Sequence, residues 1–243
     1  MKITKSSLSR LMTKYKGYLE EKKVNEFFDD FGINFAAGHW AAGDFCDRFA
    51  KKGYNSNNPD FDSGIAAKIE RVSKAGIKWI EFHDILFLDG NYKTDYDKVR
   101  EAKNAVEKFK VTPTNMSINL FGDPKWKLGG VTSPDAKIRT DALGMIYQAA
   151  DMAKEFGCKS ISIWPGADGW DYNFEVNYEN QFNWFIEACV IANKRARKNG
   201  LRFGIESKPK EPREGNMIVS TTHLAILISR IVNEKCGGTN MGI

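Results

Sequence analysis

The densest group of chemically active side chains lies in IESKPKEPREG, residues 205–215. Glu206 and Lys208 stand two positions apart after an apolar run, so on an extended strand both side chains face the same side. A carboxylate there can bind a hard divalent cation through oxygen, and an ammonium can stabilise charge that develops on a substrate oxygen. The same spacing also suits a solvated ion pair. The segment therefore indicates either a cation and substrate site or a surface ion pair at a strand end.

A second candidate is EFHDILF, residues 81–87, in which His83 and Asp84 end an apolar run. A histidine at a strand end can exchange protons near neutral pH. The alternative is a histidine that local hydrogen bonds satisfy. His39 and His223 rank lower, since His223 falls in the first turn of a predicted helix and can simply cover the helix end.

Three aromatic residues, Trp40, Phe121 and Trp164, fall at or near the ends of predicted strands. Flat apolar walls suit the C–H face of a sugar and help to exclude water from a reacting centre. Packing in the core is the commoner role of an aromatic ring. Taken with Glu206 and Lys208, these rings predict a polar pocket with aromatic walls.

The elements that must position these side chains alternate along the chain. Residues 1–30 have the pattern of a polar helical lead-in, with apolar side chains at helical spacing. Apolar runs then alternate with helical segments, the runs at 31–40, 77–84, 112–121, 159–166 and 201–207 and the helices at 63–75, 95–109, 134–156, 178–198 and 221–232. This alternation is typical of parallel βαβ units. The near-continuously apolar runs indicate strands that are buried on both faces.

A barrel and a doubly wound sheet both fit this alternation. No GxGxxG follows the first run, so a Rossmann nucleotide site has no support. In a barrel, the polar and aromatic residues at the C-terminal strand ends form the active-site face.

The strand count falls short of a closed barrel, which needs eight strands. The chain supplies about five complete βα units, and TNMGI at 239–243 resembles the opening of a sixth strand. We therefore expect an α/β fold, an incomplete (β/α)8 TIM barrel, over residues 31–243. An open half-barrel leaves a strand edge and the inner sheet face in water. We expect a longer natural chain or a partner, and no well-packed monomer from these residues alone.

Composition favours a soluble enzyme. The formal net charge is +5, but the lysines are scattered and form no basic stripe with interleaved aromatics, which argues against a nucleic-acid partner. The four cysteines form no CxxC pair, so a thiolate zinc site is not expected and a reducing compartment is. No apolar stretch has the length of a signal peptide or a membrane span. We expect a cytoplasmic protein with no membrane partner.

Five separated segments resemble xylose isomerases, in order, over about residues 31–243. IESKPKEPR is similar to that family's I-E-P-K-P-x-E-P-R, and EFHDILFL to its F-H-D-D-D-L loop. SIWPGADGWDY is similar to W-G-G-R-E-G-x-E-Y. NLFGDPKWKLGGVTSPDAKIRTDAL resembles N-L-F … G-G-x-T-S … R … A-L, and GHWAAGDFCDRF more loosely resembles G-x-W … D-P-F-G.

The resemblance implies an aldose–ketose isomerase, for D-xylose and D-xylulose or a related sugar. It implies a metal-assisted hydride shift between C1 and C2 with two divalent cations (Mg, Mn or Co), and a homo-oligomer for the complete protein. His83 would assist ring opening with Asp84 beside it, Lys208 would contact the carbonyl oxygen, and Glu206 would bind metal. The substrate-binding residues would be Trp40, Ser117, Phe121, Trp164 and Glu211.

Three departures from the family pattern matter. The family has three acids after its histidine, whereas His83 is followed by Asp84, Ile85 and Leu86. WPGADG lacks the Arg and Glu of W-G-G-R-E-G. The family's other metal ligands come from strands six to eight, which leaves Glu206 alone. Two alternatives stay open: a sugar or sugar-phosphate epimerase on the same fold, which uses a carboxylate base, and a catalytically inert sugar-binding fragment.

Overall fold

The computed structural model describes residues 4–47, 49–209 and 215–243, and the chain divides into two compact units between Ala36 and Ala37. In the first unit, α1 (Lys5–Lys14), η1 (Glu21–Lys23) and α2 (Val24–Phe31) pack through a small aromatic cluster. The Tyr15 ring meets Phe27 edge-on, with the ring centroids 5.0 Å apart. No residue of these helices is fully buried.

The second unit is built on one sheet of six strands in the order β1-β2-β3-β4-β6-β8, and β2 to β8 pair in parallel. The strands are β1 (Ala36–Gly38), β2 (Trp79–His83), β3 (Thr112–Ile118), β4 (Ser160–Ile163), β6 (Arg202–Ile205) and β8 (Met241–Gly242). Strands that are neighbours in this sheet also follow one another along the chain, as in a βα barrel. The exceptions are the short strands β5 (Gly169–Trp170) and β7 (Asn216–Met217), which form a separate sheet. The predicted sixth strand is β8. The prediction of an incomplete α/β barrel is confirmed, because the ring of strands does not close within the described part of the chain.

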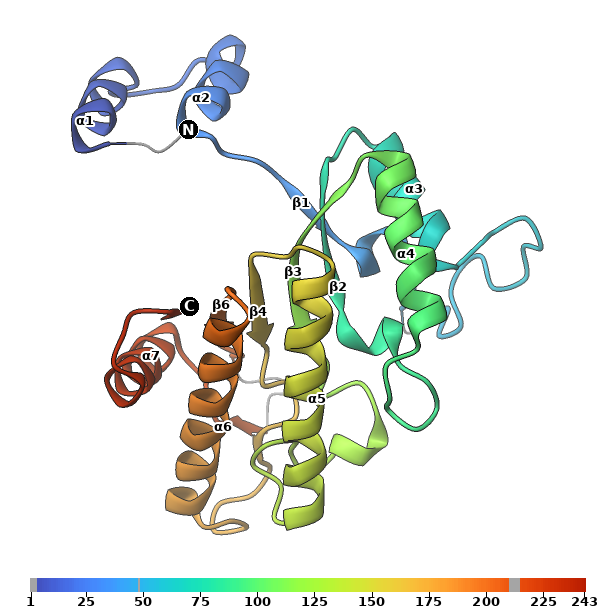
Figure 1. The fold of residues 1–243 in the computed structure, drawn as a ribbon, viewed down its shortest axis with the longest axis vertical. Coiled ribbons are helices and arrows are strands. Elements are labelled where there is room, and N and C mark those ends of the chain that lie inside the picture. The colour runs from blue at the N-terminus through green and yellow to red at the C-terminus, as the bar shows by residue number, and fades with distance from the viewer. Residues whose placement is uncertain (1–3, 48, 210–214) are drawn as a thin grey trace. The chain divides into compact units, whose positions relative to one another are not determined.

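Helices connect the strands and pack against the sheet and one another (Figure 1). They are α3 (Ile65–Lys74), α4 (Tyr96–Phe109), α5 (Ala136–Glu155), α6 (Tyr178–Lys198) and α7 (Thr222–Cys236). Asp95 caps α4 and Thr221 caps α7 through their side-chain oxygens, which satisfy backbone N–H groups of the first helical turn. Short 3-10 turns follow the strand ends, namely η2 (His39–Ala42), η3 (Asp84–Phe87) and η4 (Pro124–Trp126). Within the described ranges, no helix has the length and apolar character needed to cross a membrane.

The strands alternate between a polar and an apolar side, which corrects the prediction of strands buried on both faces. In β4, Ile161 and Ile163 are fully buried in the core, whereas Ser160 and Ser162 line an open cleft on the other side of the sheet. Since successive strand residues point to opposite faces, the helices cover the apolar side and the cleft takes the polar side. The inner face of this sheet is therefore hydrophilic.

A second, two-stranded sheet was not predicted from the sequence. β5 (Gly169–Trp170) follows β4, β7 (Asn216–Met217) follows β6, and the two pair antiparallel. This ribbon ties the loop after β4 to the loop after β6. Both loops leave the C-terminal ends of their strands, so the ribbon belongs to the face that carries the candidate site.

Candidate functional site

His83, the last residue of β2, lies among three rings. The indole of Trp40 stacks on the imidazole with centroids 4.6 Å apart and planes 23° apart. Phe121 meets it edge-on at 5.8 Å and His39 at 5.0 Å. Trp40 and His39 come from η2 after β1, and Phe121 comes from the loop after β3. The C-terminal ends of three neighbouring strands thus hold the imidazole of His83 between flat walls.

His39 is the member of this group that sequence reasoning ranked too low. The residue is 7% exposed, and neither ring nitrogen has a hydrogen-bond partner within the described residues. Burial, with smaller contributions from His83 and Lys68, lowers the pKa of His39 to about 3. Burial also lowers the pKa of His83. Both imidazoles are therefore neutral at pH 7, and two neutral rings can share the site without charge repulsion.

The aromatic row continues from Phe121 to Trp164 and ends at Lys208. Phe121 and Trp164 meet edge-on with centroids 4.6 Å apart. The Lys208 ammonium lies 4.5 Å from the centroid of the Trp164 ring and donates to the Gly166 carbonyl oxygen at 2.7 Å. Lys208 is 7% exposed and forms no ion pair within the described chain. An ammonium has three donors, so this one retains hydrogen-bonding capacity.

Glu206 and Lys208 do not lie on a strand, because β6 ends at Ile205. The pair therefore sits in the first residues after the strand, and Glu206 is exposed while Lys208 is buried. Glu206 lines the open cleft on the inner sheet face. No ion pair between Glu206 and Lys208 is found among the described residues, and their joint role at the barrel mouth stays a prediction.

Asp84, the predicted catalytic neighbour of His83, is buried at the start of η3. Its carboxyl is fully buried, and Oδ1 accepts a hydrogen bond from the Asn119 backbone N–H at 2.8 Å. Burial raises the pKa of Asp84 to about 7, against the opposing effect of its backbone hydrogen bonds. The Asn119 side chain in turn accepts from the backbone N–H of Gly122 at 2.8 Å. Asp84 therefore holds the turn that presents Phe121, and its catalytic role stays a prediction.

A row of polar side chains crosses the inner sheet face below the mouth. Ser117 Oγ lies 3.0 Å from Ser162 Oγ, and Asn115 Nδ2 donates to Ser162 Oγ at 2.7 Å and to Glu81 Oε1 at 3.0 Å. Glu81, Asn115, Ser162 and Glu206 border a cleft of about 700 Å³, and Ser117 is buried next to Ser162. Glu81 was missed in the sequence, although it stands two residues before His83 on the same strand face, which is the signal that would have found it.

Asp168 is a second residue that sequence reasoning missed. It is fully buried, and its Oδ1 accepts from both the backbone N–H and the hydroxyl of Thr132, each at 2.8 Å. Its own carbonyl oxygen accepts from the Ile218 N–H at 3.0 Å. Burial raises the pKa of this carboxyl despite these donors. Through its side chain and its backbone carbonyl, Asp168 thus joins the loops after β3, β4 and β6, which carry Phe121, Trp164 and Lys208.

The donor set for a metal ion is incomplete. Glu206 is the predicted ligand, and no group of three or more His, Cys, Asp or Glu side chains converges anywhere in residues 4–47, 49–209 and 215–243. The described residues therefore do not fit a complete divalent cation site. The remaining predicted substrate residue, Glu211, lies outside the described residues.

Comparison with known proteins identifies the fold and the family. Residues 69–239 match the family model described as xylose isomerase-like TIM barrel. Similar proteins include the xylose isomerase of Thermus thermophilus, 30% identical over 149 residues that make up 60% of this chain and 38% of that protein. The xylose isomerase of Thermus caldophilus is 26% identical over 174 residues, 70% of this chain and 45% of that protein. The matched region thus spans less than half the length of either relative.

Among solved structures, a D-allulose 3-epimerase from Methylomonas sp. has the same fold, with a TM-score of 0.60 and 13% sequence identity. The likeness covers 86% of this chain and 61% of that one. Three observations agree with a βα-barrel fold: the strand order, the position of the aromatic row at the strand ends, and the family match. The chain belongs to the xylose isomerase-like TIM barrel family.

Proposed function

We propose that the protein is an aldose–ketose sugar isomerase of the xylose isomerase type. The observation that carries the proposal is a continuous row of side-chain contacts. It runs from the His83 imidazole, which stacks on Trp40, through Phe121 and Trp164 to the Lys208 ammonium. The aromatic members provide apolar surface for the C–H face of a sugar. The end groups of the row provide a proton acceptor and a positive charge.

In this proposal His83 assists ring opening. A neutral imidazole accepts the proton of the anomeric hydroxyl and returns a proton to the ring oxygen as the C1–O bond breaks. The lowered pKa of His83 keeps the acceptor form dominant at neutral pH. Its orientation comes from Trp40, His39 and Phe121, because Ile85 and Leu86 stand where the family has acids.

Lys208 acts in the following step. In the aldose-to-ketose direction, hydrogen leaves C2 with its electron pair and bonds to C1, while the hydroxyl proton passes from O2 to O1. Negative charge develops on O1 before that proton arrives, and an ammonium aimed at O1 stabilises it. Burial of Lys208 and the π face of Trp164 place this charge in a site with little water, where it acts more strongly.

Divalent cations belong to the proposal only through Glu206, the exposed carboxylate at the mouth. A bound cation would polarise the substrate oxygens. The described residues supply Glu206 and no cluster of three or more His, Cys, Asp or Glu side chains that could hold the cation. Glu206 also supports the second candidate function: a carboxylate at the mouth can serve as the base of an epimerase.

The test is NMR of the full-length protein with D-xylose and with D-fructose in D2O, with and without Mg²⁺, Mn²⁺ or Co²⁺. The proposal expects a ketose from D-xylose, with the C2 hydrogen retained at C1. Deuterium at the inverted carbon of a ketose product would instead establish the epimerase. No product from either sugar would establish the inert sugar-binding alternative and exclude the proposal.

The first mutational prediction concerns Lys208. Lys208→Met should lower kcat by about 100-fold, the effect of removing one donor that stabilises oxygen charge, and should leave cation binding measured by calorimetry unchanged. Lys198→Met, on the exposed last residue of α6, is the matched control and should retain full activity. Full activity in Lys208→Met would separate this protein's mechanism from the proposed one.

A further inference from the structure

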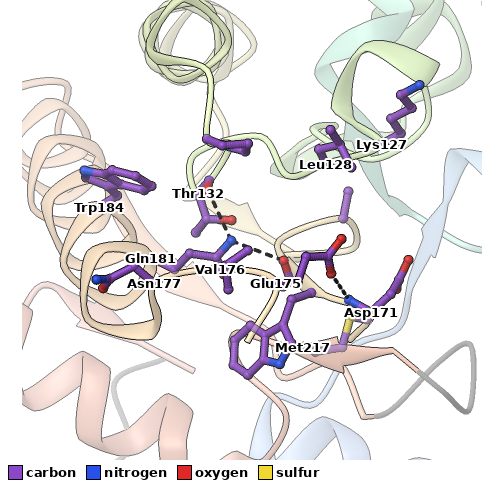
Figure 2. Close-up of a pocket in the computed structure, with 14 residues that line it drawn as sticks. Lys127, Leu128, Thr132, Asp171, Glu175, Val176, Asn177, Gln181, Trp184 and Met217 are labelled. Carbon is purple, nitrogen blue, oxygen red and sulfur yellow. Dashed lines mark hydrogen bonds between the residues drawn. The ribbon is translucent and has the colours of Figure 1, made fainter. Parts of the chain in front are cut away.

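A second pocket lies apart from the aromatic row, between the loops after β3 and β4 and the first turns of α6 (Figure 2). Its volume is about 280 Å³. None of its lining residues belongs to the row from His39 to Lys208 or to the inner cleft. The pocket is therefore a separate feature, which the proposed reaction does not use.

Two buried polar atoms beside this pocket lack hydrogen-bond partners among the described residues. Gln181 is 2% exposed, and its Nε2 donates to the carbonyl oxygens of Thr132 and Gly169 at 3.4 and 3.3 Å (Figure 2). These two bonds orient the amide and leave Oε1 as a free acceptor. The indole Nε1 of Trp170 is a free donor. Buried groups of this kind are uncommon, and an absent bound molecule is one physical explanation for them.

The walls and rim of the pocket differ in chemistry. Trp170, Trp184 and Met217 supply apolar surface. The Arg139 guanidinium lies 3.8 Å from the centroid of the Trp184 ring and fixes that ring from one side. At the rim, Glu175 Oε2 accepts from the Asp171 backbone N–H at 2.9 Å, which holds an exposed carboxylate in place (Figure 2).

We propose that this pocket binds a neutral, polyhydroxylated ligand of monosaccharide size. A sugar offers C–H faces for the tryptophans and hydroxyls that both donate and accept. One hydroxyl can donate to Gln181 Oε1, another can accept from Trp170 Nε1, and the rim carboxylates accept from further hydroxyls. Neighbouring atoms cover both buried groups in this structure, so binding involves a small rotation of the Gln181 amide or the Trp170 ring.

Other ligand classes match the pocket less well. Lys127 is the one cation among the lining residues, and the two carboxylates at the rim oppose a phosphate. An organic cation would suit the carboxylates and the rings, but it would leave the Trp170 donor without an acceptor. The cavity of about 280 Å³ lies just below the usual range for ligand pockets, so it suits a small ligand better than a nucleotide.

The six tryptophans provide the test, because each indole N–H gives one NMR signal and single Trp→Phe variants assign them. Titration of the full chain with D-xylose or D-fructose, up to about 100 mM and so far above a millimolar Kd, should move the signals of Trp170 and Trp184 saturably. Trp79 and Trp126 serve as internal controls. Trp40 and Trp164 report separately on the proposed substrate site, so failure of either proposal is visible without the other.

Variants test the assigned groups. Trp170→Phe keeps the ring and removes the donor, so binding followed at Trp184 should weaken about fivefold, as expected for one neutral hydrogen bond. Gln181→Met removes the acceptor and should weaken it similarly, with the unshifted Trp79 and Trp126 signals showing that the fold is intact. Glu175→Gln should change sugar affinity by less than about twofold, since the amide oxygen still accepts.

Two results would overturn the proposal. One is a sugar titration in which Trp170 and Trp184 do not move, whether or not Trp40 and Trp164 respond. The other is a saturable shift of Trp170 and Trp184 with choline or inorganic phosphate at concentrations where D-xylose and D-fructose have no effect. The first removes the site, and the second assigns it to a charged ligand.

Discussion

At the scale of single residues, His83 is oriented by rings. A carboxylate partner would raise the pKa of an imidazole and favour its charged form. Stacking on Trp40 and edge contacts with His39 and Phe121 orient the ring without adding charge. The pKa of His83 is accordingly lowered by burial. An activity that needs neutral His83 is therefore present above this lowered pKa and is lost as the pH falls through it.

His39 gives the residue-scale prediction. An unfolded histidine binds a proton near pH 6.5, whereas the pKa of buried His39 is about 3. Between these values the unfolded state binds more protons, so the stability that His39 contributes is complete above pH 6.5 and falls with the pH below it. His39→Leu should remove this dependence. From pH 6.5 to pH 5, the wild type should lose about 2 kcal/mol more unfolding free energy than the variant.

Urea unfolding of both proteins at the two pH values measures this difference. The raised pKa of Asp84 has the opposite sign, because folded Asp84 binds its proton more tightly, but it is common to both proteins and cancels in the comparison. His223→Leu, on the exposed start of α7, is the control and should behave as the wild type. Equal acid sensitivity in His39→Leu and the wild type would show that His39 is not buried as a neutral ring.

At the scale of elements, the site depends on how the loops after the strands are joined. Asp168 bonds Thr132 in the preceding loop, and its backbone oxygen bonds Ile218 in the following one. The β5–β7 ribbon adds the pairing of Gly169 with Met217. These links restrict the loops that carry Trp164 and Lys208. Rigid support of this kind is what keeps a site in a productive geometry.

Gly169 gives the element-scale prediction. Its φ is 155°, in the region that favours glycine, and a Cβ at this position would collide with the Asn216 carbonyl oxygen. Gly169→Ala should therefore separate β5 from β7 and lower the unfolding free energy by about 1–3 kcal/mol. Gly144→Ala, inside α5 with open space around the added methyl group, should raise it by up to about 1 kcal/mol. Urea unfolding measures both, and a neutral Gly169→Ala would mean that the ribbon does not contribute to stability.

The elements were predictable from local patterns, and their exceptions have physical reasons. Helical periodicity and the caps Asp95 and Thr221 placed α4 and α7 within a few residues. The polar inner face was readable as the alternation of Ser160 and Ser162 with isoleucines, but the overall apolar character of the run hid it. Asp168 could not be recognised, because its partner Thr132 is 36 positions away and nothing local marks the pair.

The residues of the candidate site were easier to predict from the sequence than the contacts between them. The predicted residues Trp40, His83, Phe121, Trp164 and Lys208 contact one another in a row, and their roles stay predictions. The burial of Asp84 and the contact of His39 with His83 depend on the three-dimensional closure of loops from different strands. Sequence spacing along one strand carries no information about such closure.

At the scale of the whole second unit, the sheet is open, and its inner face and its β8 edge differ in the groups that they present. The inner face is hydrophilic, since Glu81, Asn115 and Ser162 form one hydrogen-bonded row there. Within the described residues β8 pairs with β6 alone, and its other edge has no strand partner among them. Free strand edges pair readily with other chains.

This contrast predicts how the 243-residue chain behaves in solution. It should self-associate through the β8 edge as its concentration rises, while binding little of the dye anilinonaphthalene sulfonate, because association proceeds through backbone hydrogen bonds and not through an apolar patch. Light scattering coupled to size exclusion measures the mass, and dye fluorescence measures the apolar surface. The association should also persist at high salt, since screening weakens interactions between charges and leaves backbone pairing intact.

Two variants test whether the edge is responsible. Gly242→Lys places a charge on β8, where an added Cβ meets the Arg202 guanidinium only at ordinary contact distance, and charged edge strands resist pairing. This variant should remain monomeric at concentrations where the wild type associates. Thr239→Lys adds the same charge at an exposed position just before the strand and should associate as the wild type does. Two results would show that the β8 edge does not mediate assembly. One is a wild-type chain that stays monomeric at every concentration. The other is equal loss of association in both lysine variants, because added charge alone would then account for the effect.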